Sequence, residues 1–281
     1  MRLFFADDSR QSSPTRARMS SLVGIGGFSV ETDRVGSLER SLDQLAVNAG
    51  FPAREEFKWS PSRKQWMFDN LVGDHRLNFF RSVLACVQAH GAVVTVVASD
   101  TDCAPASTAA THEVDVTTLF IERAHLQLHN LSCEGVLIVE RPGGGRSQED
   151  SFLLACASLL EEGTTYVRPD SFALPVLAGS CKFLRCLQAA DVVASASLAC
   201  ISGEYTYSPP VFEIIKPILH RGPQGLVGGC GLKLHPDGRF VNLYYWLLGE
   251  TRYERYKQEP LPLPSASHPY AKDAGLAKRD A

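Results

Sequence analysis

Acidic side chains stand at the ends of apolar strand-like segments and inside one apolar helix-like segment of this chain. Asp7 follows RLFFA, Glu140 ends GVLIVE, and Asp191 stands alone in LQAADVVASASLACI. Phosphoryl chemistry with two divalent ions needs three or four carboxylates from separate elements, because Mg²⁺ prefers oxygen ligands and two ions must hold the attacking and leaving oxygens. We therefore expect Asp7, Glu140 and Asp191 to bind Mg²⁺ or Mn²⁺ for the cleavage of phosphodiester bonds.

Each of these acids, and Asp100 as well, could instead have a purely structural role. Asp100 ends the apolar segment GAVVTVVAS, and it would approach Glu140 if both lay at the carboxyl ends of neighbouring parallel strands. An acid in that position is also common as a helix cap or a solvated loop residue. Glu140 precedes Arg141, with which it could form a local ion pair. Asp191 is harder to explain structurally, because the interior of an apolar helix rarely tolerates an unpaired acid.

Apolar patterning predicts the elements that position these side chains. A strand at 2–6 that ends at Asp7 and Asp8 has a hairpin partner at 21–30. Further along the chain we expect helices at 37–49 and 63–89, a buried strand at 91–99, a helix at 113–131, a strand at 135–140, a helix at 147–161, a strand at 171–177 and a helix at 187–201. This alternation of strands and helices indicates an α/β layer with a parallel sheet.

The composition changes beyond Gly203. The segment HPDGRF lies between GGCGLKL and VNLYYWLLG and predicts a β-hairpin that turns at Asp237-Gly238. Residues from 258 onward are rich in Pro, Ser, Ala and Lys, which is typical of a disordered tail. We therefore divide the chain into a main domain at 1–203, an extension with the hairpin at 204–257, and a tail at 258–281.

Composition limits the classes of protein to which the chain can belong. Its 281 residues are 44% hydrophobic and 21% charged, which is ordinary for a globular protein. A net charge of −3 provides no general attraction for nucleic acid, so such binding would need a local basic patch. The eight cysteines are scattered and form no C-x-x-C motif, which favours buried, reduced thiols. No apolar run is long enough to span a membrane, so we expect a soluble, cytoplasmic protein without a membrane partner.

Four motifs together resemble the domain of unknown function 3800 family. FFADDSR resembles the family's strand followed by DESG, EFKWS resembles its E-x-K segment, LIVER resembles its apolar strand ending in an acid, and GSCKFLRCLQAADVVASA is similar to its S…LQLADLVA signature. The match spans residues 1 to 202 in the right order, and LQAADVVA is its most specific part. The chain departs from the family in the DDSR segment, which lacks the Gly, in Glu140, where Asp is expected, and in LQAAD, which replaces LQLAD.

The resemblance implies an RNase H-like fold, a mixed sheet flanked by helices. It also implies that Asp7, Glu56, Glu140 and Asp191 are the metal-binding catalytic acids, with Lys58 and Ser180 as supporting polar groups. Lys58, Arg63 and Lys64 would then position phosphates, although a solvated charge run explains them equally well. The partner would be nucleic acid, either DNA or RNA.

Two rival functions stay open at this point. A catalytically degenerate RNase H-like protein would serve as a binding or scaffold module, with a protein partner at the C-terminal region through Phe240, Tyr244, Tyr245 and Trp246. A hydrolase with a serine or cysteine nucleophile lacks support, because the chain contains no G-x-S-x-G motif.

Overall fold

The centre of the fold is a six-stranded mixed sheet in the order β5-β4-β1-β2-β3-β6. A computed structural model describes residues 1–16, 19–103, 109–143, 145–168, 170–236, 240–255 and 258–263. The strands are β1 (Arg2–Gln11), β2 (Leu22–Glu31), β3 (Val93–Asp100), β4 (Gly135–Glu140), β5 (Leu177–Gly179) and β6 (Leu232–His235). β2 runs antiparallel to both β1 and β3, whereas β4 is parallel to β1 and β5, and β6 is parallel to β3. The chain is therefore an α/β protein with a mixed sheet, as expected, and the predicted antiparallel pairing of the first two strands is confirmed.

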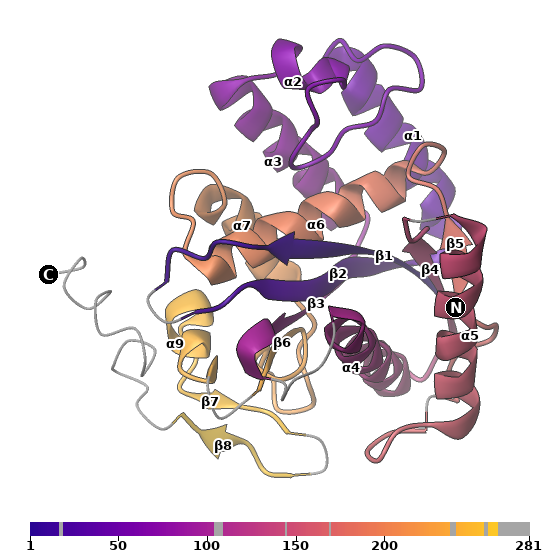
Figure 1. The fold of residues 1–281 in the computed structure, drawn as a ribbon, viewed down its shortest axis with the longest axis vertical. Helices are drawn as coiled ribbons and strands as arrows, with labels where there is room; N and C mark the ends of the chain where they lie inside the picture. Colours follow the sequence, from indigo (N-terminus) through magenta and orange to yellow (C-terminus); the bar gives the residue numbers. More distant parts are fainter. Residues whose placement is uncertain are drawn as a thin grey trace, which may run out of the picture.

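Helices cover both faces of this sheet (Figure 1). On one face lie α1 (Thr32–Asn48), α3 (Gly73–Ala89), α6 (Arg185–Ser202) and α7 (Pro209–Ile215), with α2 (Trp66–Asn70) beyond them. On the other face lie α4 (Ala109–Asn130) and α5 (Arg146–Glu162). Two short 3₁₀ turns, Thr101–Cys103 and Lys216–Ile218, complete the helical elements described up to β6.

Strand alternation assigns each residue of β1 to one of two separate cores. Phe5 packs in the core beneath α1, α3, α6 and α7, whereas Phe4 and Ala6 pack in the core beneath α4 and α5. Successive side chains of a strand point to opposite faces, so Asp7 shares the face of Phe5 and Asp8 shares the face of Ala6. Asp7 consequently looks toward α6.

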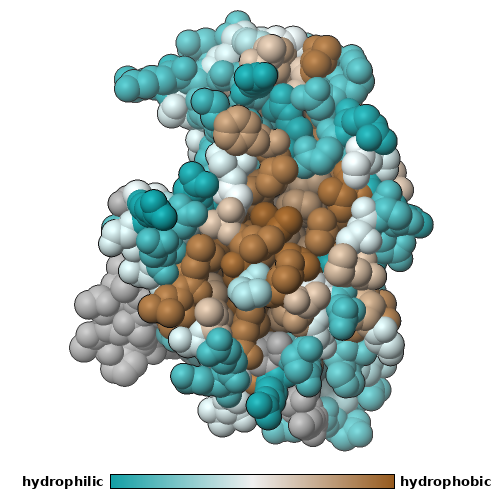
Figure 2. All heavy atoms as spheres, turned by 90° about the vertical axis from the view of Figure 1, so that its right-hand side faces the viewer, coloured by the Kyte–Doolittle hydropathy of each residue, from teal (hydrophilic) through white to brown (hydrophobic). Residues whose placement is uncertain are grey.

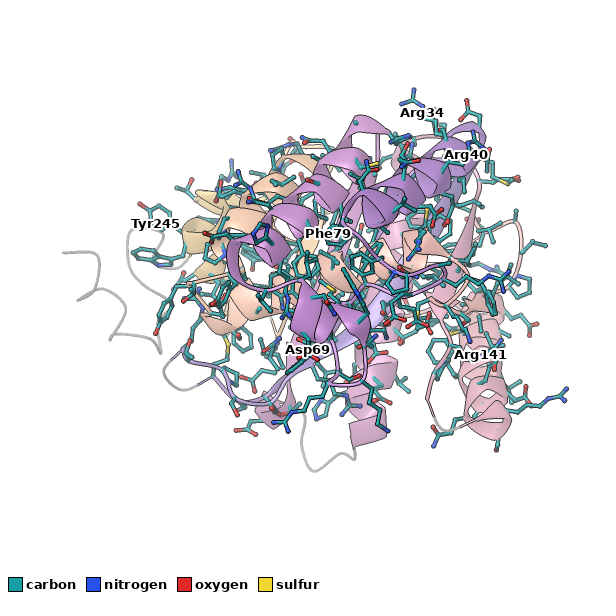
Figure 3. All side chains as sticks on the ribbon, turned by 90° about the horizontal axis from the view of Figure 1, so that it is seen from above. Arg34, Arg40, Asp69, Phe79, Arg141 and Tyr245 are labelled. Atoms are coloured by element: carbon teal, nitrogen blue, oxygen red, sulfur yellow. The ribbon has the colours of Figure 1, made fainter. Side chains whose placement is uncertain are left out.

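Figure 3 shows the first core from above. Phe79 of α3 points into the molecule, whereas Arg34 and Arg40 of α1 project outward. Phe79 lies 5.3 Å from Phe57, measured between ring centroids, in an edge-to-face arrangement. The aromatic packing beneath α3 therefore holds the segment that contains Phe57 and its neighbour Lys58.

Several predicted elements differ from the structure at their ends. The helix expected at 63–89 is two helices, α2 and α3, because Leu71 and Val72 have extended backbone and Gly73 has a positive φ of 55°. The strand expected at 171–177 is reduced to β5, although Phe172 forms an isolated bridge with Gly135.

The strand expected at 2–6 extends to Gln11, because β2 remains paired with β1 past both acids. Asp7 and Asp8 therefore lie inside a strand and not at its end.

The predicted C-terminal hairpin is wrong. Residues 243–248 form the helix α9 (Leu243–Leu248), in which Tyr244 is fully buried, and Asp237 and Gly238 lie outside the described residues. An amphipathic segment of this length fits a helix as well as a strand, and burial of one face of α9 decides between them. The extension at 204–257 instead contributes β6 to the main sheet, beside β3.

Part of the expected disordered tail is ordered. β7 (Arg252–Tyr253) and β8 (Leu261–Pro262) pair in an antiparallel ribbon, and Leu263 is buried. Leu263 also donates its backbone N–H to the carbonyl oxygen of Thr251. The remainder of the predicted tail, residues 264–281, lies outside the described residues.

An apolar strip crosses the face of the molecule that carries α5 and β5 (Figure 2). Large apolar side chains on these elements and their neighbours are exposed, namely Leu154, Leu174, Leu177 and Phe183. β5 is the edge strand of the sheet on this side. In the described part of the chain, no helix combines the length and the apolarity needed to cross a bilayer.

Candidate active site

The strand pairing places Asp7 at an opening between β1 and β4. The parallel ladder between these strands ends at the pair Ala6 and Val139. Asp7 is therefore the first residue of β1 after its parallel pairing with β4 ends. Glu140, which follows Val139, is the last residue of β4. Beyond this point β1 is paired only with β2, so the end of β4 leaves room beside Asp7.

Asp191 reaches this opening from α6, the helix that packs across β1 and β2. Its Oδ2 accepts a hydrogen bond of 2.7 Å from the backbone N–H of Trp59. The hydroxyl of Ser195, one turn later, lies 3.5 Å from the Oδ1 of Asp191 and 3.0 Å from the hydroxyl of Ser9 on β1. These contacts tie α6 to β1 beside Asp7.

Glu140 is held by the loop between β5 and α6. The backbone N–H of Cys181 donates a hydrogen bond of 2.6 Å to the Oε2 of Glu140. The thiol of Cys181 lies 3.4 Å from the Oε2 of Glu56. Cys181 therefore links two of the predicted acids, Glu140 and Glu56.

Burial and mutual repulsion raise the pKa values of these carboxyl groups. The side chain of Asp7 is 7% exposed, and burial together with the nearby carboxylates of Asp191 and Asp8 raises its pKa to about 8. Burial also raises the pKa values of Asp191 and Glu140 above their ordinary ranges. The raised pKa favours the protonated form of Asp7, because burial of its carboxylate among other acids is costly.

Lys58 brings a positive charge to the same group. Burial lowers the pKa of its ammonium group, but Cys181 and the three acids Asp191, Asp7 and Glu140 act against burial and leave the pKa raised. The structure thus brings Asp7, Glu140, Asp191 and Lys58 into one electrostatic group, with Glu56 joined to it through Cys181.

Gln188 joins two segments that carry residues of this electrostatic group, the loop at Cys181 and the segment at Phe57. Its side-chain amide donates to the carbonyl oxygen of Cys181 at 2.6 Å and accepts from the backbone N–H of Phe57 at 3.3 Å. Arg185 adds a hydrogen bond of 2.8 Å to the Oε1 of Gln188 and one of 2.7 Å to the carbonyl oxygen of Glu55. The L-Q-A-A-D segment therefore does more than supply Asp191, because Gln188, at i−3 on the same helix, binds the E-x-K segment and the Cys181 loop together.

Sequence reasoning did not single out Gln188 or Arg185, and it interpreted Cys181 as a buried, reduced thiol. Gln188 could have been suspected, because a glutamine in an otherwise apolar helix needs buried hydrogen-bond partners. Glu39 of α1 was also missed, and its carboxylate accepts the backbone N–H groups of Arg185 and Cys186 at the start of α6. No local pattern in the sequence predicts that contact, because Glu39 and α6 are far apart along the chain.

Other residues considered in the sequence lie elsewhere or act differently. The carboxylate of Asp100 accepts the backbone N–H groups of Ser20 and Asp102, so Asp100 stabilises turns and does not approach Glu140 as a strand neighbour. Arg141 pairs with Glu149 at 3.0 Å and not with Glu140.

Ser180 lies next to Cys181, but the described structure records no hydrogen bond from its side chain. Arg63 and Lys64 are exposed, in agreement with a solvated charge run.

The group of Asp7, Glu140 and Asp191 contains the oxygen ligands that a hard divalent cation prefers. Its side chains are not arranged in a geometry that could hold such an ion among the described residues. Carboxylate oxygens are the ligands that Mg²⁺ and Mn²⁺ prefer, and burial beside Asp191 and Asp8 raises the pKa of Asp7. Within the described ranges, no three His, Cys, Asp or Glu side chains have a geometry that could hold a metal ion. A metal would therefore have to displace the proton of Asp7 and draw the carboxylates together.

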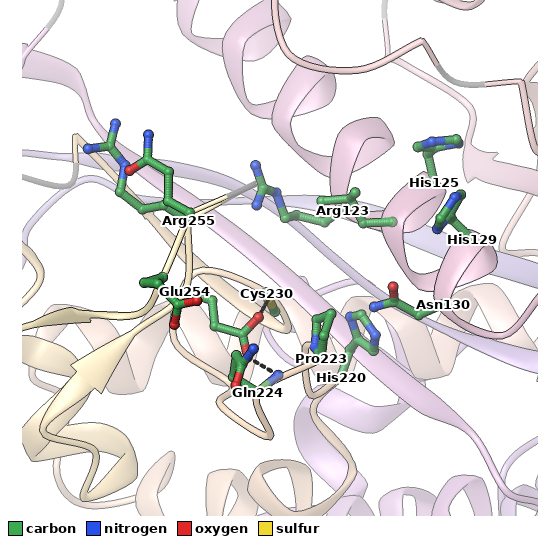
Figure 4. A pocket seen from close by; sticks show the side chains of 13 residues that line it. Arg123, His125, His129, Asn130, His220, Pro223, Gln224, Cys230, Glu254 and Arg255 are labelled. Carbon is green, nitrogen blue, oxygen red and sulfur yellow. Dashed lines mark hydrogen bonds between the residues drawn. The ribbon is translucent and has the colours of Figure 1, made fainter.

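A further cavity lies elsewhere, between α4 and the C-terminal extension (Figure 4). It has a volume of about 680 Å³, and its walls include Arg123, His125, His129 and His220. The buried Nδ1 atoms of His125 and His220 have no hydrogen-bond partner among the residues that the structure describes. Burial beside Arg123 lowers the pKa of His220 to about 4. Three histidines that look scattered in the sequence are thus gathered at one cavity, to which Glu254 and Glu259 also contribute.

No family model matches this chain, and no curated protein shows a significant match to it. The resemblance to the domain of unknown function 3800 family therefore stays a prediction that depends on the four motifs.

Proposed function

We propose that this protein is a metal-dependent nuclease that hydrolyses phosphodiester bonds of nucleic acid and has an RNase H-like fold. The fold part is supported by the mixed sheet with helices on both faces. The functional part depends mainly on one observation, the electrostatic coupling of Asp7, Asp191 and Glu140, which come from two strands and one helix. Buried acids from separate elements whose pKa values are raised together mark a functional site more often than isolated acids do.

Asp7, Glu140 and Asp191 would hold one or two Mg²⁺ or Mn²⁺ ions, with Glu56 as a further ligand. Bound ions would supply a hydroxide nucleophile and stabilise the leaving oxygen. Before binding, Asp7 carries a proton, and Lys58 balances the charge of the neighbouring carboxylates. The N–H groups of Trp59 and Cys181 orient Asp191 and Glu140, which limits the rotamers that the two carboxylates can adopt. Lys58 is also placed to hold a phosphate oxygen of the substrate next to the acids.

The decisive experiment is a cleavage assay with labelled single- and double-stranded DNA and RNA in Mg²⁺ or Mn²⁺. We expect products from the wild type, and losses of at least a hundredfold in Asp7→Asn and Asp191→Asn. Asp69→Asn is the matched control, because Asp69, labelled in Figure 3, is an exposed acid on α2 and is not one of the proposed ligands. Cleavage that survives both active-site substitutions, or that continues in excess EDTA, would refute the proposal.

A non-catalytic binding role remains the second candidate. It is favoured by the absence of a ready metal geometry among the described residues and by Glu140 standing where the resembled family has an aspartate. Calorimetric titration with Mn²⁺ separates the two candidates. A wild type that binds no Mn²⁺ at millimolar concentration and cuts none of the substrates would be a binding protein.

A further inference from the structure

An apolar pocket of about 200 Å³ opens beside two of the proposed catalytic acids, Asp7 and Glu140. It lies on the other face of β1 from α6, between the sheet and the helices α4 and α5. Its apolar walls are formed by Val23, Ile25, Val116, Val139 and Phe152. The proposed metal ligands and the apolar pocket therefore meet at the same strand ends and are approached from opposite faces of the sheet.

The rim of this pocket is polar and acidic. Asp8 is exposed at the rim, and Glu113 forms an ion pair with Arg10. Gln148 also lines the pocket, and its side-chain amide has no hydrogen-bond partner among the described residues. A rim with the carboxylates of Asp8 and Glu113 disfavours a phosphate group but accepts hydrogen bonds from amino groups.

The pocket chemistry suits a flat, neutral heterocycle with N–H groups at its edge. Pockets that hold drug-sized ligands have volumes of about 300 to 1,000 Å³, so a pocket of about 200 Å³ fits a smaller group. A nucleobase has apolar faces that stack on aromatic rings such as that of Phe152, and amino groups that a carboxylate such as Asp8 can bind. Thr117 and Gln148 provide further polar contacts at the edge.

We propose that this pocket binds one unpaired base of the substrate, next to the phosphate that is cleaved. This inference rests on the nuclease proposal and deepens it, because it defines the substrate class. A base inside a duplex is stacked and paired, and extracting it costs a few kcal/mol. The protein therefore acts on single-stranded nucleic acid, or on a strand with an unpaired nucleotide at the cut.

The first test uses wild-type protein and a single-stranded substrate in which one position after another is made abasic. Loss of the base at one position next to the cut should slow cleavage by roughly tenfold or more, whereas loss at distant positions should have little effect. The matched duplex should be cut at least tenfold more slowly than the single strand.

The second test compares Phe152→Ala with Leu159→Ala. Both residues are partly buried on α5 in the same core, but only Phe152 lines the pocket. Phe152→Ala should slow cleavage of the intact strand roughly tenfold and remove the sensitivity to the abasic position. Leu159→Ala should keep that sensitivity, which separates loss of the pocket from loss of core packing.

The possible results distinguish this inference from the nuclease proposal. Metal-dependent cleavage with equal rates on duplex, single-stranded and abasic substrates would overturn the base pocket and leave the nuclease standing. If the wild type cuts nothing, the nuclease proposal fails, and fluorescence anisotropy with the intact and abasic single strands decides on the pocket. Equal affinity for the intact and the abasic single strand, or no binding of either one, would overturn the base-pocket proposal.

Discussion

Asp7 pairs with Gly26 across the antiparallel ladder of β1 and β2. A Cβ atom at position 26 would lie 2.6 Å from the Cα atom of Ala194 on α6, so α6 packs directly against the backbone of β2 beside Asp7. Ala194 lies three residues after Asp191, and side chains at this spacing share a face of the helix. Because residue 26 has no side chain, α6 can pack close to β2, and this close packing determines the distance between Asp191 and Asp7.

Gly26→Ala should consequently damage both stability and the site. A methyl group that meets backbone atoms must displace α6, and overpacking of this kind costs about 1 to 3 kcal/mol in the free energy of unfolding. We expect Mn²⁺ binding to weaken in parallel, because Asp191 moves with the helix. Denaturant unfolding and calorimetry measure the two effects.

Gly36→Ala is the control for that substitution. Gly36 lies in the helix α1, and a Cβ atom there would meet only the Nη1 of Arg40, at 3.5 Å. This change should stabilise the protein by about 0.5 to 1 kcal/mol, because alanine is the better helix former. If Gly26→Ala and Gly36→Ala behave alike, close packing of α6 on β2 does not control the site.

The stability of the protein should fall as the pH rises, and Asp7 should be a main cause. Its pKa is raised from 3.8 to about 8, so the folded state holds a proton that the unfolded state releases. The contribution of this proton to stability is fully present below the ordinary pKa and is lost as the pH rises through about 8. Asp7→Asn stays neutral at every pH and should exceed the wild type in stability above that pH, by a few kcal/mol at most.

This pH dependence is measured by urea unfolding of both proteins in EDTA across pH 4 to 9. The two stability curves should converge toward low pH. Curves that stay parallel over the whole range would show that Asp7 is ionised in the folded protein and that the site already carries a compensating charge.

Divalent cations should stabilise the wild type and depend on Asp191. A ligand that binds only the folded state adds about 2.7 kcal/mol to stability at a concentration one hundred times its dissociation constant. We therefore expect Mn²⁺ to raise Tm of the wild type by several degrees and to leave Asp191→Asn almost unchanged. An equal shift in both proteins would place the cation at another site.

Lys58 should matter most when no metal is present. Lys58→Met removes the positive charge beside Asp7, Asp191 and Glu140, and in EDTA at pH 8 it should lower stability by about 1 to 2 kcal/mol. Mn²⁺ should narrow this difference, because a divalent ion restores the missing positive charge. Lys64→Met is the control, since Lys64 is exposed and nearby in sequence. A stability difference that Mn²⁺ leaves unchanged would indicate that Lys58 serves packing alone.

Much of the site was predictable because its residues lie in regular elements with strong local patterns. The apolar segments that end in Asp7 and Glu140 and the helix around Asp191 were all expected, and they form β1, β4 and α6. The expected approach of Asp100 to Glu140 was wrong, because β1 and β2 lie between β3, which ends at Asp100, and β4, which ends at Glu140. Strand order depends on contacts between distant segments, and local periodicity contains no information about it.

The sequence by itself determined that the segments around Asp7, Glu140 and Asp191 form strands and a helix, because apolar periodicity is a local property. The tertiary structure alone decided that α9 is a helix, that β6 joins the main sheet, and that Gln188 and Cys181 connect Glu56 and Glu140 to α6. It also buries Asp7 among other carboxylates, which raises the pKa of this group. The physical reason is that the energy of a buried polar group depends on its partners, and only the folded chain brings those partners together.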